Sequence, residues 1–390
     1  MLGECPGDLL VSTIAINLAA PCKLEETDWI TPGKGVWDWR VNGYTAPDGF
    51  TYGINTESYI RLIDFAAEHD IPLMELAGIW WRFVDGELQA VPSLDMERIM
   101  SYAKARNVGI MLYYDHKQGG CMELEELCRL YAEMGAAGIK YGFRGNDAEF
   151  TRRAIDMAAE YGLTIYFHDR PCPMTGVRRT MPNALAREYC HAQQDARKAF
   201  SPTGFLKMAM INALSGPLDM ANGAFGLDGI NRGERRYGPR AKESFNSTVV
   251  SEAARILVIF SGLDLLPDAP EEYSRKSDLF DFIARLPATW EETRIINSEI
   301  GEHISTARRK GDEWFVGSVI DEEGGTLEIP LDFLDKGRDY AVRFYEDAPD
   351  SHFRNKRERY RIRDGEVGST DIVKAEMAPG GGHCMWIRPL

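Results

Sequence analysis

Apolar segments of strand length alternate with amphipathic segments of helix length from about residue 36 to residue 295. The expected strands are Val36–Trp39, Ile71–Leu76, Val108–Tyr113, Gly138–Tyr141 and Leu163–Phe167. The expected helices are Glu57–His69, which Asn55 or Thr56 could cap, Leu94–Arg106, Glu123–Met134 and Glu149–Tyr161. Strand–helix repeats at intervals of roughly 25 to 37 residues imply right-handed βαβ units and therefore a parallel sheet.

A doubly wound open sheet and a closed barrel both satisfy this repetition. No GxGxxG motif follows the first expected strand, which weakens the dinucleotide-binding form of the open sheet. A chain of 390 residues has room for a barrel and a smaller module. We therefore expect an α/β fold with a (β/α)8 TIM barrel over residues 1–295.

The sequence changes character after about residue 300, where short alternating segments are separated by Gly, Asp and Pro. The expected strands there are Glu313–Ile320, Thr326–Ile329, Tyr340–Phe344 and His383–Ile387. This pattern predicts a small C-terminal all-β sandwich over residues 296–390.

Charge and cysteine content narrow the classes of partner. A formal net charge of -15 argues against nucleic acid or an anionic membrane as a partner. The seven cysteines include no CxxC pair, so neither a disulfide framework nor a zinc ribbon is indicated. The apolar run Asp8–Ala20 lacks a basic flank and is too short to span a bilayer. We expect a cytoplasmic protein, or a periplasmic or secreted one if a signal has been removed.

Polar side chains follow several expected strands, and functional residues of parallel barrels lie at the carboxyl ends of strands. The candidates are Trp37, Asp38, Asp115, Lys140, His168, Asp169, Arg179, Glu188 and Asp219. Carboxylates interleaved with aromatic rings suit glycoside chemistry, in which one acid protonates the leaving oxygen and a carboxylate attacks or activates water. A single carboxylate is more often a cap or an ion-pair partner, so the coincidence after successive strands is the signal. His168 and Asp169 near Glu188 could also hold a hard cation, for which oxygen ligands favour calcium over zinc.

Longer motifs carry a resemblance to a known family. They are Asp28–Trp39, Gly53–Tyr59, Gly138–Lys140, Met174–Asn183 with Arg187 and Glu188, Gly216–Asp219, Trp290–Arg294, Trp314–Gly317, Pro330–Leu334 and Pro379–Gly382. Together they resemble glycoside hydrolase family 97, a family of α-glucosidases and α-galactosidases with a barrel and a C-terminal β-sandwich. The family normally has an N-terminal β-sandwich as well. A separate subunit, a homo-oligomer contact or a shortened chain would account for its absence from this sequence.

The resemblance also assigns residues. Retaining members carry an aspartate nucleophile where this chain has Gly142, whereas inverting members also have glycine there. Asp115 and Asp169 match the base positions of inverting members, one methylene shorter than the family's glutamates. The general acid falls at Gln194, or at Asp195 after a shift of one residue, and Glu188 with Asp169 and Gln194 would hold calcium. Family carboxylates near the second strand are replaced by Ala77 and Gly78.

The resulting expectation is an α-glycosidase of the α-glucosidase or α-galactosidase type, inverting if active, that acts on a small carbohydrate. Asp115, Asp169 and Asp195 would be catalytic, and the substrate-binding residues would be Trp37, Asp38, Lys140, His168, Arg179 and Asp219. Two alternatives stay open. One is a sugar-binding protein that has lost hydrolysis, and the other is a homo-oligomer or a subunit that needs a partner domain.

Overall fold

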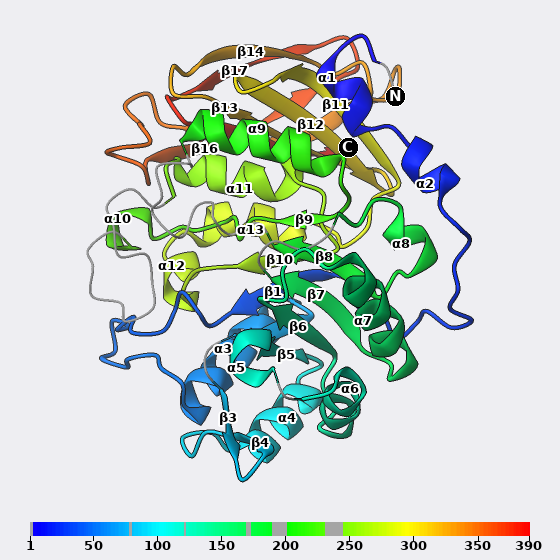
Figure 1. Cartoon of the computed structure of the whole chain (residues 1–390). Helices are drawn as coiled ribbons and strands as arrows, with labels where there is room; N and C mark the ends of the chain where they lie inside the picture. The colour runs from blue at the N-terminus through cyan, green and yellow to red at the C-terminus, as the bar shows by residue number, and fades with distance from the viewer. Residues whose placement is uncertain (1–2, 78–79, 121, 169–172, 189–200, 231–244) are drawn as a thin grey trace.

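The computed structural model describes residues 3–77, 80–120, 122–168, 173–188, 201–230 and 245–390. These residues form a parallel barrel and an antiparallel C-terminal domain, which confirms the expected fold class (Figure 1). Within the described ranges, every helix is too short or too polar to cross a bilayer.

Eight parallel strands form the barrel in the order β10-β1-β2-β5-β6-β7-β8-β9. They are β1 (Gly33–Trp37), β2 (Leu73–Leu76), β5 (Gly109–Asp115), β6 (Gly138–Gly142), β7 (Thr164–His168), β8 (Ala184–Glu188), β9 (Leu218–Asp219) and β10 (Leu263–Leu266). The sheet nearly closes between β9 and β10, where the amide of Leu218 donates a hydrogen bond to the carbonyl of Phe260 at 2.9 Å. The five strands expected from sequence are all present, with ends shifted by up to three residues.

The helices of the first half of the barrel also match the sequence pattern. They are α3 (Thr56–Glu68), α4 (Met96–Ala105), α6 (Leu124–Glu133) and α7 (Ala148–Glu160). Helix α3 buries Tyr59, Leu62, Ile63 and Ala66, which lie on one face at helical spacing. Asn55 is its N-cap, because its side chain accepts a hydrogen bond from the amide of Ser58.

The remaining helices between β5 and the C-terminal domain vary in length from four to twelve residues. They are α5 (His116–Gly119), α8 (Val177–Thr180), α9 (Pro202–Ala213), α10 (Leu227–Ile230), α11 (Val249–Val258), α12 (Pro270–Ser274) and α13 (Ser277–Arg285). A small hairpin of β3 (Trp81–Val84) and β4 (Glu87–Ala90) follows β2.

The C-terminal domain consists of a six-stranded antiparallel sheet and a two-stranded sheet. Its strands are β11 (Glu292–Glu299), β12 (His303–Lys310), β13 (Glu313–Ile320), β14 (Gly325–Pro330), β15 (Tyr340–Asp347), β16 (Tyr360–Val367), β17 (Ile372–Met377) and β18 (Gly382–Pro389). Val316, Ile329, Phe344 and Met385 lie in its apolar core. The expected boundary between residues 295 and 296 falls within β11.

Helix α11 joins the two domains, because all ten of its residues are buried. Figure 1 shows α9, α11 and α13 between the barrel and the C-terminal sheet. A Cβ atom at Gly382 would lie 2.5 Å from the Cα atom of Ser251, so the helix can approach β18 only because this residue is glycine.

The N-terminal segment crosses the outside of both domains. Helix α1 (Pro6–Leu10) contacts β11, where the amide of Gly7 donates to the hydroxyl of Ser298 at 2.9 Å. Helix α2 (Ile14–Leu18) lies against α8. The apolar run that the sequence shows here is therefore a strap over the amino ends of the later barrel strands.

Candidate active site

A buried lysine lies at the centre of the carboxyl end of the barrel. Lys140 on β6 places its Nζ atom 3.1 Å from Oε2 of Glu75 on β2 and 2.9 Å from Oε2 of Glu188 on β8. The three side chains are at most 2% exposed. Strand geometry explains the meeting, because alternate residues of each strand point into the barrel.

Aromatic rings complete the surroundings of this ammonium group. Its Nζ atom lies 4.5 Å from the ring centre of Trp37 and 4.9 Å from that of Tyr166. Such faces attract a cation by their quadrupole, and more strongly when water is excluded. The expected site residues Trp37 and Lys140 are thus brought together.

The protonation of this cluster follows from its burial. Burial raises the pKa of Glu75 to about 8, with Glu188 and Asp38 adding to the effect and Lys140 opposing it. Burial lowers the pKa of Lys140, but Glu188 and Glu75 more than offset this and leave it above its usual value. At neutral pH the cluster therefore holds a charged ammonium group beside a largely protonated Glu75.

Asp219 on β9 is a second buried carboxyl in the barrel. Its Oδ2 atom accepts a hydrogen bond from the hydroxyl of Tyr166 at 2.8 Å, and Oδ1 accepts from the amide of Ala221 at 2.8 Å. Burial raises its pKa to about 7, and the nearby Glu188 adds to this. Asp219 is thus linked to the lysine cluster through Tyr166.

Asp38 supports the cluster from the side of β1. It is buried and accepts hydrogen bonds from the hydroxyl of Tyr59 at 2.8 Å and from the amide of Ala77 at 2.9 Å. These bonds fix the loop after β1 against the end of β2. The expected role in binding sugar directly therefore has less support than a role in holding these two strand ends.

His168 is the expected site residue that reaches the surface. Its side chain is 16% exposed, and its Nε2 atom lies 3.5 Å from Oε2 of Glu188. The hydroxyl of Tyr113 lies 3.3 Å from its Nδ1 atom. His168 thus connects the buried cluster with the outside of the barrel.

Asp115 ends β5, as expected, but its carboxylate also caps α5. Oδ1 accepts hydrogen bonds from the amides of Lys117 and Gln118 at 2.9 and 3.3 Å, and Oδ2 accepts from Nε2 of Gln118 at 3.0 Å. Both oxygens of this carboxylate are therefore hydrogen-bonded. It would have to leave the cap to act as a free base.

Gly142 lies opposite Asp115 in the sheet register. A Cβ atom at this glycine would lie 2.4 Å from the hydroxyl oxygen of Tyr113. The tyrosine therefore fills the space into which a side chain at position 142 would project.

One expected residue lies at the wrong end of the barrel. Arg179 is in α8, which precedes β8, and its Nη1 atom donates to the carbonyls of Ile16 and Asn17 at 2.9 Å. Because α8 leads into the amino end of β8, its side chain is separated from the carboxyl-end cluster by the length of that strand. Arg179 holds the N-terminal strap, and these contacts give no support to its expected role in binding sugar, which stays a prediction.

Three other expected residues, Asp169, Gln194 and Asp195, lie outside the described residues. Calcium therefore stays a prediction. Of its expected ligands only Glu188 is described, and the ammonium group of Lys140 already balances its charge at 2.9 Å. The described ranges contain no group of three or more His, Cys, Asp or Glu side chains arranged to hold a metal.

The sequence reasoning missed Glu75 and Tyr166. Glu75 lies within the apolar run Leu73–Leu76, and Tyr166 lies within a run of β-formers, so both were counted as strand residues. A carboxylate in the middle of a buried strand is a signal in itself, because burial of an unpaired charge is costly.

Comparisons with known proteins identify the family. The sequence model described as "Glycoside hydrolase 97" matches residues 36–190, and that described as "Glycosyl-hydrolase 97 C-terminal, oligomerisation" matches residues 289–388. The chain belongs to glycoside hydrolase family 97.

Relatives agree with this family 97 assignment. A protein of Bacteroides thetaiotaomicron named "Retaining alpha-galactosidase" is 30% identical over 98% of this chain and 58% of its own length. A family 97 enzyme of Pseudoalteromonas sp. strain K8, solved with panose, is 26% identical with a TM-score of 0.87, over 100% of this chain and 65% of its own. A β-arabinopyranosidase, 21% identical with a TM-score of 0.76, shares the fold over 99% of this chain and 60% of its own.

Two consequences follow for this family 97 chain. It spans about three fifths of the length of the curated relative that it matches. The name of that relative includes the word "retaining", which conflicts with the inversion expected from Gly142. This relative therefore does not support the expectation that the chain is an inverting glycosidase.

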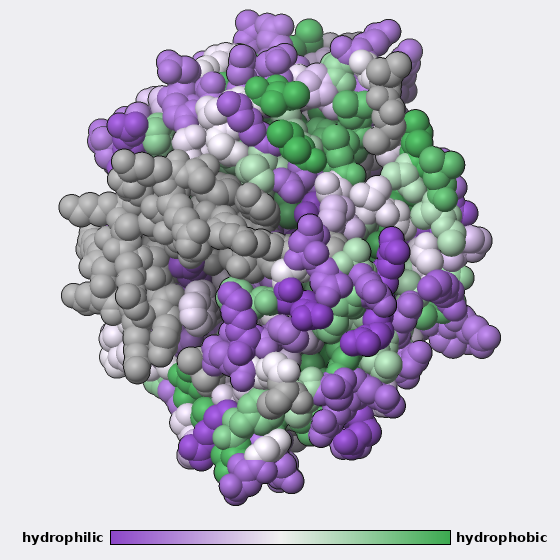
Figure 2. All heavy atoms as spheres, viewed as in Figure 1, coloured by the Kyte–Doolittle hydropathy of each residue, from purple (hydrophilic) through white to green (hydrophobic). Residues whose placement is uncertain are grey.

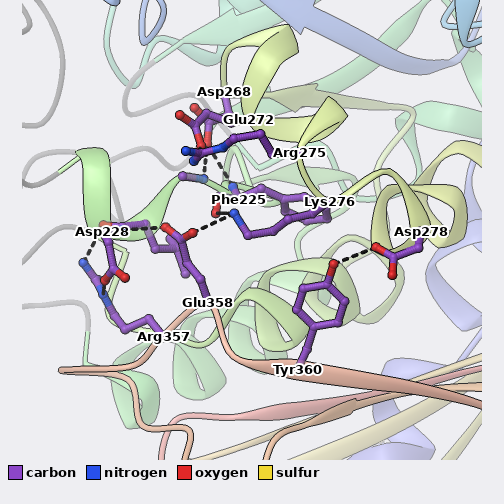
Figure 3. Close-up of polar contacts among 12 residues, drawn as sticks. Phe225, Asp228, Asp268, Glu272, Arg275, Lys276, Asp278, Arg357, Glu358 and Tyr360 are labelled. Atoms are coloured by element: carbon purple, nitrogen blue, oxygen red, sulfur yellow. Dashed lines mark hydrogen bonds and ion pairs between the residues drawn. The ribbon is translucent and has the colours of Figure 1, made fainter. Parts of the chain in front are cut away.

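A second group of polar contacts ties the loop after β9 to the C-terminal domain (Figure 3). Lys276 donates to the carbonyl of Phe225 at 3.0 Å and pairs with Glu358 at 2.6 Å. Glu358 in turn accepts from the amide of Asp228 at 2.7 Å. Asp268 accepts from the amide of Phe225 at 2.9 Å. Because these side chains bond to one another, we interpret them as structural contacts that hold the loop after Asp219 in place.

Proposed function

We propose that this chain is the catalytic part of an α-glycosidase and that α-galactosides are its substrates. The observation that carries the proposal is the buried cluster of Glu75, Lys140 and Glu188 at the carboxyl end of the barrel. The name of the Bacteroides thetaiotaomicron relative supports the choice of α-galactosides.

The cluster would support glycoside chemistry from beneath the sugar site, because its three side chains are buried. Bond cleavage builds positive charge on the sugar ring and needs a proton for the leaving oxygen. Carboxylates at the strand ends offset the developing charge, and Lys140 holds Glu188 in one position beside His168. The sugar would lie against His168 and the ends of β5 to β8, with Asp115 and Asp169 as the carboxylates that act on it.

Hydrolysis of 4-nitrophenyl α-galactoside and 4-nitrophenyl α-glucoside tests the proposal. We expect turnover of the galactoside at a higher kcat/KM, and a loss of at least about a hundredfold in kcat for Asp115→Asn. Asp156→Asn, at a partly exposed position of α7 where the carboxylate pairs with Lys23, is the matched control and should retain activity. Absence of turnover of both substrates by the wild-type chain would contradict the proposal.

The stereochemical course can be measured in the same assay by NMR of the first anomer released. With Tyr113 filling the space beside Gly142, a carboxylate nucleophile has to come from another strand end if the product is the α-anomer. The β-anomer would point instead to water attacking directly. The same assay with and without a chelator tests whether calcium takes part.

A second candidate is a protein that binds sugar without cleaving it. The engagement of Asp115 in the cap of α5 favours this candidate, because its two oxygens are already hydrogen-bonded. Calorimetric binding of galactose without turnover of either nitrophenyl glycoside would select it.

We also propose that the chain forms a homo-oligomer through its C-terminal domain. The description of the family model that matches residues 289–388 includes oligomerisation and supports this. Sedimentation of the whole chain, with a monomer as the contradicting outcome, tests it.

A further inference from the structure

A groove opens at the amino end of the barrel, where the N-terminal strap meets the C-terminal domain. It has a volume of about 460 Å³, within the range of small-molecule sites. The strap from Leu9 to Ile16 forms one wall, β11 forms another, and Pro217 and Phe260 form the floor. Figure 2 shows hydrophobic spheres gathered at the upper right, over α1 and α2 of this strap.

Two arginines line this groove around one aromatic ring. The guanidinium carbon of Arg178 lies 4.4 Å from the ring centre of Phe260, and that of Arg308 lies 5.5 Å from the same centre. Arg308 is only 4% exposed, and its Nη2 atom donates to the carbonyl of Ile259 at 3.3 Å. Two like charges are thus held on one phenyl ring.

Neither guanidinium group has a carboxylate partner in the described part of the chain. Arg178 makes no hydrogen bond or ion pair to any described residue, and the buried Nε atom of Arg308 has no hydrogen-bond partner there. Arg308 is buried, so its Nε donor without an acceptor is costly, whereas Arg178 is exposed to solvent. Both guanidinium groups retain donors suited to an oxyanion. Burial, together with the charge of Arg178, lowers the pKa of Arg308 to about 10 against the opposing effect of Asp264.

Two acidic side chains near the groove, Glu291 and Glu292, are engaged elsewhere. Glu291 pairs with Arg309 and Lys310, and Glu292 pairs with Arg294 and Arg309. Asp264 lies beside Lys34 in the register of β1 and β10, behind Arg308. Asp264 and Arg308 form no ion pair within 4.0 Å in the described part of the chain, and burial raises the pKa of Asp264 well above its usual value. Among the described residues, the two guanidinium groups of the groove therefore have no ion-pair partner, in a chain of net charge -15.

We propose that this groove binds a small molecule bearing a carboxylate or phosphate group, which Arg178 and Arg308 hold between them. Guanidinium groups bind these oxyanions through paired charge-assisted hydrogen bonds. The groove is separate from the proposed glycosidase site, because Pro217 and Phe260 precede β9 and β10 and so lie at the amino ends of those strands. Its ligand would bridge the strap, the barrel and the C-terminal domain.

Titration calorimetry of the whole chain with inorganic phosphate tests the proposal. We expect one site per chain, weakened at least about tenfold in Arg178→Gln, because one charge-assisted contact is lost. Arg152→Gln, on the exposed side of α7, is the matched control and should bind phosphate as the wild type does. Binding should also weaken with added sodium chloride.

Galactose 6-phosphate and galacturonate, each compared with galactose, distinguish the possible sources of the oxyanion. If either sugar binds more tightly than inorganic phosphate and loses affinity in Arg178→Gln, the ligand carries its oxyanion on a sugar ring. If the sugars and inorganic phosphate bind with equal affinity, the ligand is the free ion. No phosphate binding by the wild type, or equal binding by wild type and Arg178→Gln, would overturn the proposal. A change of oligomeric state in Arg178→Gln without a change in phosphate affinity would also overturn it, in favour of an interface between copies.

Discussion

The two ends of the barrel differ in how their positive side chains are neutralised. At the carboxyl end the ammonium group of Lys140 lies between two glutamates, within 3.1 Å of both. At the amino end Arg178 and Arg308 share the ring of Phe260 and have no carboxylate partner among the described residues. The charge of Lys140 is balanced within the chain, whereas the two arginines have no counter-ion among the described residues. This difference agrees with the two proposals, a glycosidase site at the carboxyl end and an anion site at the amino end.

Removing the charge of Lys140, at the carboxyl end of the barrel, should have the largest effect on stability. We expect Lys140→Met to lower the free energy of unfolding by about 3–5 kcal/mol, because Glu75 and Glu188 are left buried without their cation. Urea denaturation measures this. Lys104→Met, exposed on α4, should change the value by less than about 0.5 kcal/mol. A stability equal to the wild type would show that the cluster adjusts by taking up protons.

The second largest effect on stability is expected when a side chain is added at Gly142, also at the carboxyl end of the barrel. Gly142→Ala brings a methyl group against the hydroxyl of Tyr113, and overpacking of this kind costs about 1–3 kcal/mol. Thermal unfolding would measure the loss. Tyr113→Phe in the same chain removes the nearest atom and should recover part of the loss. Gly368→Ala, where a Cβ atom meets nothing within 4 Å, is the control. An unchanged melting temperature for Gly142→Ala would mean that this end is less tightly packed than described.

The charge state of the cluster predicts a pH dependence. The pKa of Glu75 rises from an ordinary 4.5 to about 8 on folding, so the folded state holds the proton more tightly. Its stabilising contribution is complete below pH 4.5 and is lost as the pH rises to about 8, by up to about 1.4 kcal/mol per pH unit.

Glu75→Gln should therefore show a flatter stability profile between pH 5 and 8 than the wild type, as measured by urea denaturation across that range. Glu133→Gln, exposed at the end of α6, should keep the wild-type slope. Parallel profiles for wild type and Glu75→Gln would show that Glu75 is ionised in the folded protein.

The smallest effect on stability is expected for Arg178, at the amino end of the barrel. Arg178→Gln should change the free energy of unfolding by less than about 0.5 kcal/mol, since no ion pair is lost and one repulsion is relieved. Denaturation in buffer free of phosphate measures it. A loss of more than about 2 kcal/mol would mean that Arg178 is paired within the chain, and the contrast between the two ends would disappear.

The sequence predicted the first half of the fold well because its strands and helices have strong, separate periodicities. Helix α3 begins at Thr56 and ends at Glu68, one residue from the expected bounds at each end. Strand β9 has two residues, too few for any pattern to emerge. Strand β16 was missed because it is an edge strand whose alternate positions carry charges rather than apolar side chains.

The candidate site was only partly predictable. Lys140 and Glu188 follow the rule that strand ends carry function, and the structure brings them together. Glu75 was hidden in an apolar run, and its importance depends on Lys140, which is 65 residues away in sequence. Arg179 matched a motif, but a motif does not say at which end of a strand its side chain lies. Contacts between distant strands, rather than local patterns, decide these cases.

Burial raises the pKa of Glu75 to about 8 and that of Asp219 to about 7. Two carboxyl groups in the core of the barrel therefore gain or lose protons near neutral pH. A neutral ligand that displaces water above the cluster would alter how many protons it holds. Its binding heat would then depend on the ionisation enthalpy of the buffer, although the ligand itself carries no charge.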